Sequence, residues 1–237
     1  MQILSIIFSV VLAMSVSAQT PSVQQAFDEG TQKAQTRNYK NAIEYYQKAV
    51  LLSQNGKMNN DFLARIHFNL GVCLFHLRRN SEAVKELTEA INLRRGKYQK
   101  AFYALGMAHG AMKNWQTAKT AFRQAVALKH NDGEAWFDLA LVLLEEKDFD
   151  AAETAFQNAV KYKSIGSADA HNNLGVIYAL RNNFSAAEKE FKTALIESNG
   201  KSFEAQNNLQ FCKLYKQNFN RNLSGKLEFR RKNKQGE

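Results

Sequence analysis

Two side chains with metal-binding chemistry, Cys73 and His76, stand three residues apart. At that spacing a thiolate and an imidazole share one face of a helix, and both are common zinc ligands. A closed tetrahedral site needs four ligands, whereas the five histidines fall on different segments of the chain. The sequence also lacks a phosphate-binding glycine loop, a nucleophile elbow and a zinc-protease helix motif. We therefore expect no metal site, no cofactor and no catalytic residues.

Another set of polar residues is better suited to binding a peptide. Asparagines recur at one position of a regular pattern, and a carboxamide can both donate to and accept from a single peptide unit. This series consists of Asn69, Ala104, Asp138, Asn173 and Asn208. The residue directly before each member is aromatic at Phe68, Tyr103 and Phe137, and then becomes Asn172 and Asn207.

The segment from Gly133 to Lys161 predicts the kind of element that positions these residues. Its apolar residues follow helical spacing in two stripes separated by a polar turn. The first stripe is Trp136, Leu139, Ala140 and Leu143, and the second is Ala152, Phe156 and Ala159. Such a hairpin of two helices cannot bury its apolar face alone, so copies of it are required.

The chain supplies those copies at a nearly constant interval. The pairs Leu70-Gly71, Leu105-Gly106, Leu139-Ala140 and Leu174-Gly175 recur after 35, 34 and 35 residues, and Ala83, Ala118, Ala152 and Ala187 keep step with them. This pattern resembles the tetratricopeptide repeat family, except that the proline usual at each repeat's end is absent. The resemblance implies an all-α, right-handed solenoid of about five helical hairpins plus a C-terminal capping helix. In that family the first helices of successive repeats line a concave groove.

Four other titratable side chains, two histidines and two glutamates, are interpreted as structural. His67 and His171 occupy the same stripe position as Trp136, which predicts core packing. Glu145 and Glu146 fall in a predicted turn, where we expect them to be solvated.

The two cysteines are not expected to form a disulfide. Cys73 and Cys212 lie four repeat steps apart in an array where each unit touches only its neighbours. A disulfide requires the two Cα atoms within about 7 Å of each other. Both residues are therefore interpreted as small buried hydrophobic side chains.

The chain begins with a segment that looks like a secretory signal peptide. Met1 to Ala18 carries no charged side chain, and its apolar run is shorter than the roughly 17 to 25 residues of a membrane-spanning helix. We expect export to the periplasm or the extracellular space, with a mature chain that begins at Gln19. An N-terminal anchor and a buried helix remain as alternatives. The expected division is 1–18 signal peptide, 19–52 degenerate first repeat, 53–63 polar loop, 64–199 four repeats, 200–218 capping helix and 219–237 basic tail.

Charge suggests a second way of binding. The 237 residues carry a formal net charge of +10, and the tail holds six Lys or Arg against two Glu. A basic surface favours acidic partners. The export signal disfavours nucleic acid as a partner, and no stripe of Lys and Arg alternates with aromatic residues at a fixed repeat position. The alternative function is attachment to polyanions or to a membrane surface through this tail.

The pattern as a whole indicates an exported, non-catalytic scaffold that binds a protein or peptide segment in its concave groove. The expected groove residues are Phe68, Asn69, Tyr103, Phe137, Asn173 and Asn208. The competing interpretation is that the same residues pack between adjacent first helices. Some members of the family clamp a C-terminal carboxylate, but of the positions that do so only Asn69 and Lys100 match here. An enzyme, or the regulatory repeats of a split glycosyltransferase, is disfavoured because no catalytic domain is evident.

Overall fold

The computed structural model describes residues 22–54 and 58–217, which form eleven α-helices and no strand. The all-α class expected from the repeat pattern is thus confirmed. The predicted signal peptide (1–18) and basic tail (219–237) lie outside the described residues. The helices are α1 (Val23–Gln35), α2 (Tyr39–Ser53), α3 (Asn60–His76), α4 (Asn80–Leu93), α5 (Gln99–Ala111), α6 (Trp115–Leu128), α7 (Gly133–Glu145), α8 (Phe149–Lys161), α9 (Ser167–Leu180), α10 (Phe184–Glu197) and α11 (Phe203–Gln217).

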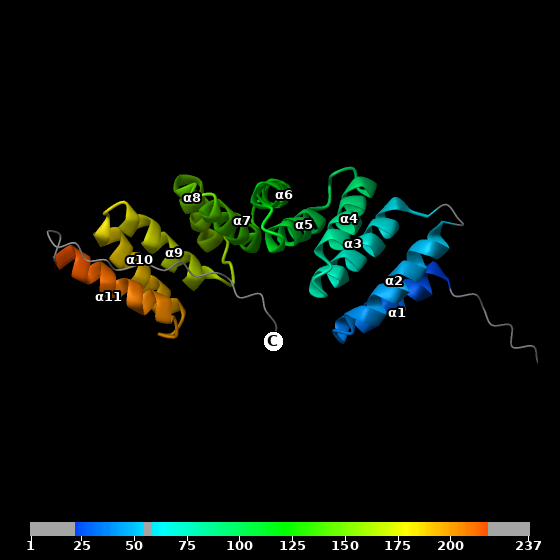
Figure 1. Ribbon diagram of the computed structural model, residues 1–237, viewed down its shortest axis with the longest axis horizontal. Coiled ribbons are helices and arrows are strands. Elements are labelled where there is room, and N and C mark those ends of the chain that lie inside the picture. Colours follow the sequence, from blue (N-terminus) through cyan, green and yellow to red (C-terminus); the bar gives the residue numbers. More distant parts are fainter. Residues whose placement is uncertain (1–21, 55–57, 218–237) are drawn as a thin grey trace, which may run out of the picture.

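The helices pack as five hairpins followed by one single helix. Each odd-numbered helix from α1 to α9 packs against the even-numbered helix that follows it, and each even-numbered helix also packs on the next odd-numbered one. The first helices of successive hairpins touch as well, α1 with α3, α3 with α5 and α5 with α7. The hairpins follow one another along an arc that runs from α1 and α2 to α11 (Figure 1). Four clusters of buried apolar side chains lie in series along it, so the core is distributed between neighbours.

Within each hairpin a small residue on the first helix lets the second helix approach closely. A Cβ added at Gly71 would lie 2.7 Å from Leu87, and one at Gly106 would lie 2.8 Å from Phe122. Distances this short exclude a larger side chain unless the neighbour moves. The glycines of the repeat pattern are therefore contact points between helices.

The turns inside the hairpins use capping side chains and a left-handed residue. The Asp148 side chain accepts a 3.2 Å hydrogen bond from the amide of Ala151 and so begins α8. Just before it, Lys147 has a φ of 61°, and the Asp148 amide donates back to the Leu143 carbonyl at 3.0 Å. Arg37, Arg78, Lys113 and Asn182 have the same backbone conformation in the equivalent turns.

The connection between the first two hairpins is shorter than the polar loop expected at 53–63. Ser53 is the last residue of α2, and α3 begins at Asn60, because the Asn59 side chain accepts a 2.7 Å hydrogen bond from the Asp61 amide. Residues 55–57 lie outside the described part of the chain. Among the helices that the structure describes, none combines the length and apolar character needed to cross a membrane.

Candidate functional site

The predicted binding residues lie on the first helices, where successive hairpins meet. The Tyr103 hydroxyl on α5 donates a 2.7 Å hydrogen bond to Oδ2 of Asp138 on α7. Burial, and then the negative charge of Asp138, raise the pKa of Tyr103. At the same pair of positions further along, Nδ2 of Asn208 on α11 donates to Oδ1 of Asn172 on α9 at 3.0 Å. The series from Asn69 to Asn208, which we call the polar series, therefore lies where the first helices of successive hairpins meet.

The aromatic residues that precede the polar series pack against other rings. Phe68 lies 5.2 Å from the ring of Tyr98, at the start of the next hairpin. Tyr103 lies 5.8 Å from Phe122, and Phe137 makes an edge-on contact with Phe156 at 5.6 Å. Rings at these separations gain stabilisation beyond the burial of their area. The contacts of Tyr103 and Phe137 therefore stabilise single hairpins, and the contact of Phe68 joins one hairpin to the next.

The six expected groove residues differ in their exposure. Phe68, Asn69 and Tyr103 are half-buried, on the adjacent first helices α3 and α5. Phe137, Asn173 and Asn208 are buried, with at most 1% of their surface exposed. The structure thus brings the six onto one layer of helices, with the first three partly exposed and the last three buried. The last three therefore contribute to packing.

Cys73 and His76, the residues with metal-binding spacing, face different surroundings. Cys73 is buried, and this burial raises the pKa of its thiol to about 11. The His76 ring stacks on Tyr39 at 4.4 Å, and desolvation and the charge of Arg37 lower its pKa. In the part of the chain that the structure describes, no three His, Cys, Asp or Glu side chains are grouped as metal ligands would be. Cys212 is likewise a buried free thiol.

Two histidines assigned to core packing instead form pairs with carboxylates. Nδ1 of His67 lies 2.7 Å from Oε2 of Glu86, and Nδ1 of His171 lies 2.6 Å from Oε2 of Glu190. Both pairs join the two helices of one hairpin. The sequence contains a signal for these pairs, because histidine and glutamate occur together at these two positions. The two hairpins in between have an aromatic residue with an alanine instead, Phe102 with Ala121 and Trp136 with Ala155.

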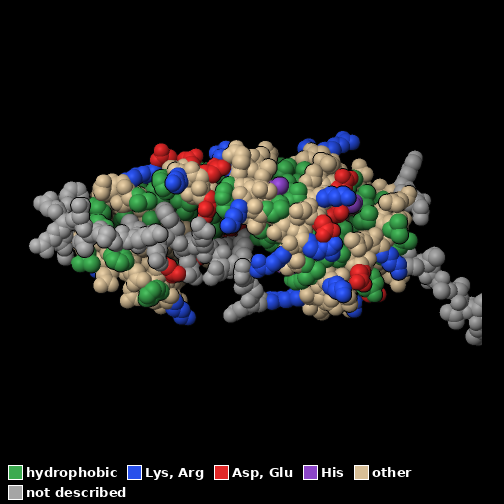
Figure 2. Space-filling model, in the orientation of Figure 1, with side chains coloured by type: hydrophobic (Ala, Val, Ile, Leu, Met, Phe, Trp, Pro, Cys, Tyr) green, Lys and Arg blue, Asp and Glu red, His purple; other side chains and the backbone are tan. Residues whose placement is uncertain are grey.

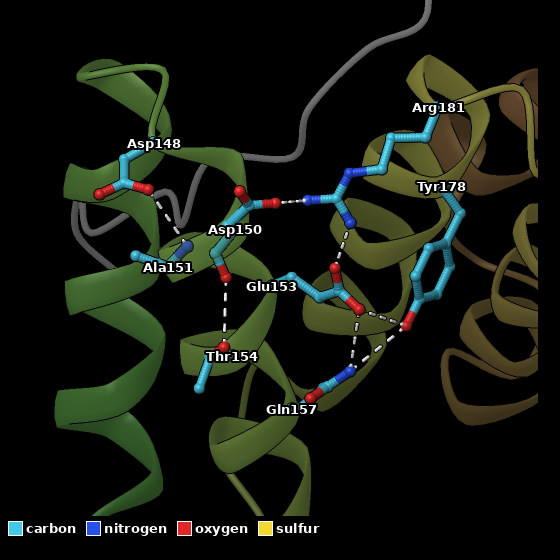
Figure 3. A network of polar contacts seen from close by, with 8 residues as sticks. All are labelled: Asp148, Asp150, Ala151, Glu153, Thr154, Gln157, Tyr178 and Arg181. Carbon is cyan, nitrogen blue, oxygen red and sulfur yellow. Dashed lines mark hydrogen bonds and ion pairs between the residues drawn. The ribbon is translucent and has the colours of Figure 1, made fainter.

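Ion pairs recur where the second helix of one hairpin meets the end of the next first helix. Glu146, expected to be solvated, pairs with Lys119 of the preceding hairpin. One repeat later Arg181, which follows α9, pairs with both Asp150 and Glu153 of α8 (Figure 3). The Tyr178 hydroxyl also donates to Oε1 of Glu153 at 2.9 Å. A third pair occupies the same register, Lys216 with Glu188 at 3.5 Å. The second helix carries the cation in the first pair and the anion in the other two. A hairpin docked on the wrong neighbour would therefore bring like charges together.

Comparison with known proteins assigns the repeats. Three segments of the chain, 27–101, 103–164 and 147–202, match the family described as Tetratricopeptide repeat. Sperm-associated antigen 1 of Homo sapiens is 32% identical over 123 residues, which is 51% of this chain and 12% of that protein. Anaphase-promoting complex subunit 3 of Schizosaccharomyces pombe is 28% identical over 126 residues, 52% of this chain and 19% of that protein. The chain therefore corresponds to a small part of either relative.

Solved structures share the same arrangement of helices. The crystal structure of MamA protein superimposes with a TM-score of 0.65 at 24% identity, covering 76% of this chain and 93% of that one. YrrB, described as a TPR protein with an unusual peptide-binding site, gives 0.62 at 22% identity, covering 83% and 93%. The fold and the matched segments agree with the hairpins described above. The chain belongs to the tetratricopeptide repeat family.

Proposed function

We propose that this chain is a non-catalytic scaffold that binds an extended segment or a helix of another protein along its first helices. The observation that carries the proposal is the half-buried group of Phe68, Asn69 and Tyr103 on two adjacent first helices. Aromatic rings with a partly exposed face commonly anchor protein interfaces. The peptide-binding site described for YrrB supports this choice by analogy of fold.

Two kinds of side chain make the proposed contacts, aromatic rings and asparagine carboxamides. Phe68 and Tyr103 provide apolar surface for a partner side chain, and the Asn69 carboxamide can donate to and accept from its backbone. Asn173 and Asn208 extend the polar row toward the C-terminal end, at greater depth. A partner would thus meet an apolar region near α3 and α5 and a polar one near α9 and α11.

Site-specific photo-cross-linking on the full chain tests the binding face. A photoreactive residue in place of Phe68 is compared with one in place of Glu89, which is exposed on the second helix α4. We expect a partner to be captured from position 68 and not from position 89. The segment captured is then titrated by calorimetry against Phe68→Ala and Asn69→Ala, with Glu89→Gln as control. Loss of the Asn69 contacts should weaken binding by about 0.5–1.5 kcal/mol per hydrogen bond.

Variants of the buried residues separate binding from packing. Asn173→Ala, Asn208→Ala and Phe137→Ala remove side chains that are buried in the array. If the partner reaches this depth, affinity and melting temperature should fall together. Normal binding by both asparagine variants, together with lower melting temperatures, would show that these two residues are structural.

The proposed place of action is outside the cytoplasm, in the periplasm or the extracellular space. It depends on the uncharged, apolar sequence from Met1 to Ala18. N-terminal sequencing of material from the native source should return Gln19 as the first residue. Recovery of Met1 on the mature protein would contradict this part of the proposal.

Attachment to polyanions or to an acidic membrane surface is the second candidate function. It is favoured by the six Lys or Arg of residues 219–237 against two Glu. Full-length chain should then be retained on heparin or on vesicles containing phosphatidylserine, and the retention should weaken with salt. Deletion of Phe219 to Glu237 should abolish it. Retention that survives the deletion would exclude the tail as the attachment site.

A further inference from the structure

Charge changes sign along the face of the first helices. Each residue of the series from Asn69 to Asn208 lies four positions after a charged one, and residues at this spacing share a helical face. These charged residues are Arg65 on α3, Lys100 on α5, Glu134 on α7, Asp169 on α9 and Glu204 on α11. At this position the first helices are thus basic on α3 and α5 and acidic on α7, α9 and α11. Figure 2 shows Lys and Arg side chains together with Asp and Glu side chains over the N-terminal half of the array, so the change of sign concerns this one helical position.

The acidic character is strongest on α7, where one stripe contains Glu134, Asp138, Leu141 and Glu145 at spacings of four, three and four residues. We call these four residues the α7 stripe. An acidic residue in the first turn, such as Glu134, is favoured by the helix dipole and also accepts a 2.8 Å hydrogen bond from Ser164. Asp138, in the middle of the helix, accepts the hydrogen bond from Tyr103, whereas Glu145 lies at the end of the helix, where the dipole does not favour an acidic residue.

The same face also offers apolar surface. Leu141 of the α7 stripe is half-buried and packs at the edge of the central core cluster. The combination of carboxylates with partly exposed aliphatic side chains fits a segment that carries basic and apolar residues together.

A segment with this composition follows α11 in the same chain. The tail contains Lys226, Arg230, Arg231, Lys232 and Lys234. Its apolar residues Phe219, Leu223 and Leu227 stand four positions apart, the spacing of one helical face. Charge and apolar pattern are therefore both complementary to the C-terminal half of the first-helix face.

We propose that this half of the face, from the α7 stripe to Glu204, is a docking surface for the chain's own tail, residues 219–237. The distance is compatible with this. α11 contacts α9, and α8 contacts both α9 and α7, so this path of packed helices, about 8–10 Å for each step, puts the α7 stripe within roughly 30 Å of α11. A tail of about 20 residues spans roughly 30 Å as a helix and more when extended. It reaches α7 in either conformation.

The docked tail would compete with a partner for the same helices. This consequence depends on the proposed scaffold function, whereas the contact between tail and face does not. A partner would then bind more tightly once the tail is displaced or removed, because it no longer has to compete with an intramolecular ligand.

Zero-length carbodiimide cross-linking of the full chain tests the contact without any partner. We expect Lys226, Lys232 or Lys234 to be joined to Glu145, Asp169 or Glu204 within one molecule. A mixture of ¹⁵N-labelled and unlabelled chains identifies links between two molecules. The double variant Glu145→Gln, Asp169→Asn should reduce the tail cross-links severalfold, and the matched variant Glu89→Gln on α4 should leave them unchanged.

Two outcomes would overturn the proposal. One is tail cross-links that reach carboxylates of the second helices as often as those of α7, α9 and α11. The other is cross-links found only between labelled and unlabelled chains, which would assign the surface to a second copy. Hydrogen exchange gives an independent measurement on the full chain, since reversing the charge at Arg230, Arg231 and Lys232 should speed exchange in α7 and α9 but not in α3. Unchanged exchange in all three helices would also contradict it.

Discussion

The Tyr103 hydroxyl and the Asp138 carboxylate, 2.7 Å apart, join α5 to α7 across the seam between two hairpins. Only 6% of Asp138 is exposed, so its hydrogen-bond partners are not readily replaced by water. The contact links the aromatic row of one hairpin to the polar series of the next.

Tyr103→Phe removes the donor and leaves the ring in place. We expect a loss of about 1–3 kcal/mol in the free energy of unfolding, because a buried carboxylate loses a partner. Asp138→Asn retains an oxygen acceptor and should cost less. Urea denaturation of the three proteins measures the difference, and equal stability of Tyr103→Phe and the parent would contradict the role given to this bond.

Two glycines in first helices should respond in opposite directions to alanine. A Cβ at Gly175 would lie 2.5 Å from the Phe191 ring, whereas one at Gly110 meets its nearest atom, on Trp115, at 4.0 Å. Gly175→Ala should destabilise the fold by about 1–3 kcal/mol through overpacking. Gly110→Ala should stabilise it by up to about 1 kcal/mol through helix propensity. Thermal melting of both variants tests the pair, and a stabilised Gly175→Ala would show that the hairpin is loosely packed.

The two carboxylates that bind Arg181 should contribute unequally. Glu153 is 22% exposed at its side chain and Asp150 is 94% exposed, so water screens the second pair more strongly. Double-mutant cycles with Arg181→Met should give a coupling of about 0.3–1 kcal/mol with Glu153→Gln and nearly none with Asp150→Asn. Added salt should reduce the first coupling. A larger coupling to Asp150 would reverse our ranking.

Alkaline pH should destabilise the array through Cys73. Burial holds the pKa of its thiol near 11 in the folded chain, against 9.0 ordinarily. The unfolded chain therefore loses the proton first as pH rises. This contribution is fully present below pH about 9 and is lost between about 9 and 11, at most about 1.4 kcal/mol for each pKa unit.

Cys73→Ala should flatten that part of the stability profile, whatever its effect near neutral pH. Urea midpoints measured across the same pH interval provide the comparison. A parent and variant whose curves fall in parallel would assign the loss to other groups, such as Tyr46 and Tyr103, whose pKa values burial also raises.

The sequence predicts which helices carry the residues of the candidate site, but it does not predict how deeply each residue is buried. The interval from Asn69 to Asn208 puts the polar series on successive first helices, where the structure has it. The sequence left open whether these residues line a groove or pack between helices, because spacing along one helix does not report what lies opposite. Asn173 is buried whereas Asn69 is half-buried, and this difference depends on neighbours from other hairpins.

The sequence by itself determined the all-helical class and the hairpin repeat, because small and large apolar residues at fixed spacing can be buried only by stacking like units. The tertiary structure alone decided which polar side chains meet. Tyr103 and Asp138 are separated by 35 residues, and Glu153 and Arg181 by 28. The rotation of one hairpin on the next brings each pair together, and this geometry results from the packing of whole helix faces, which no single residue pattern encodes.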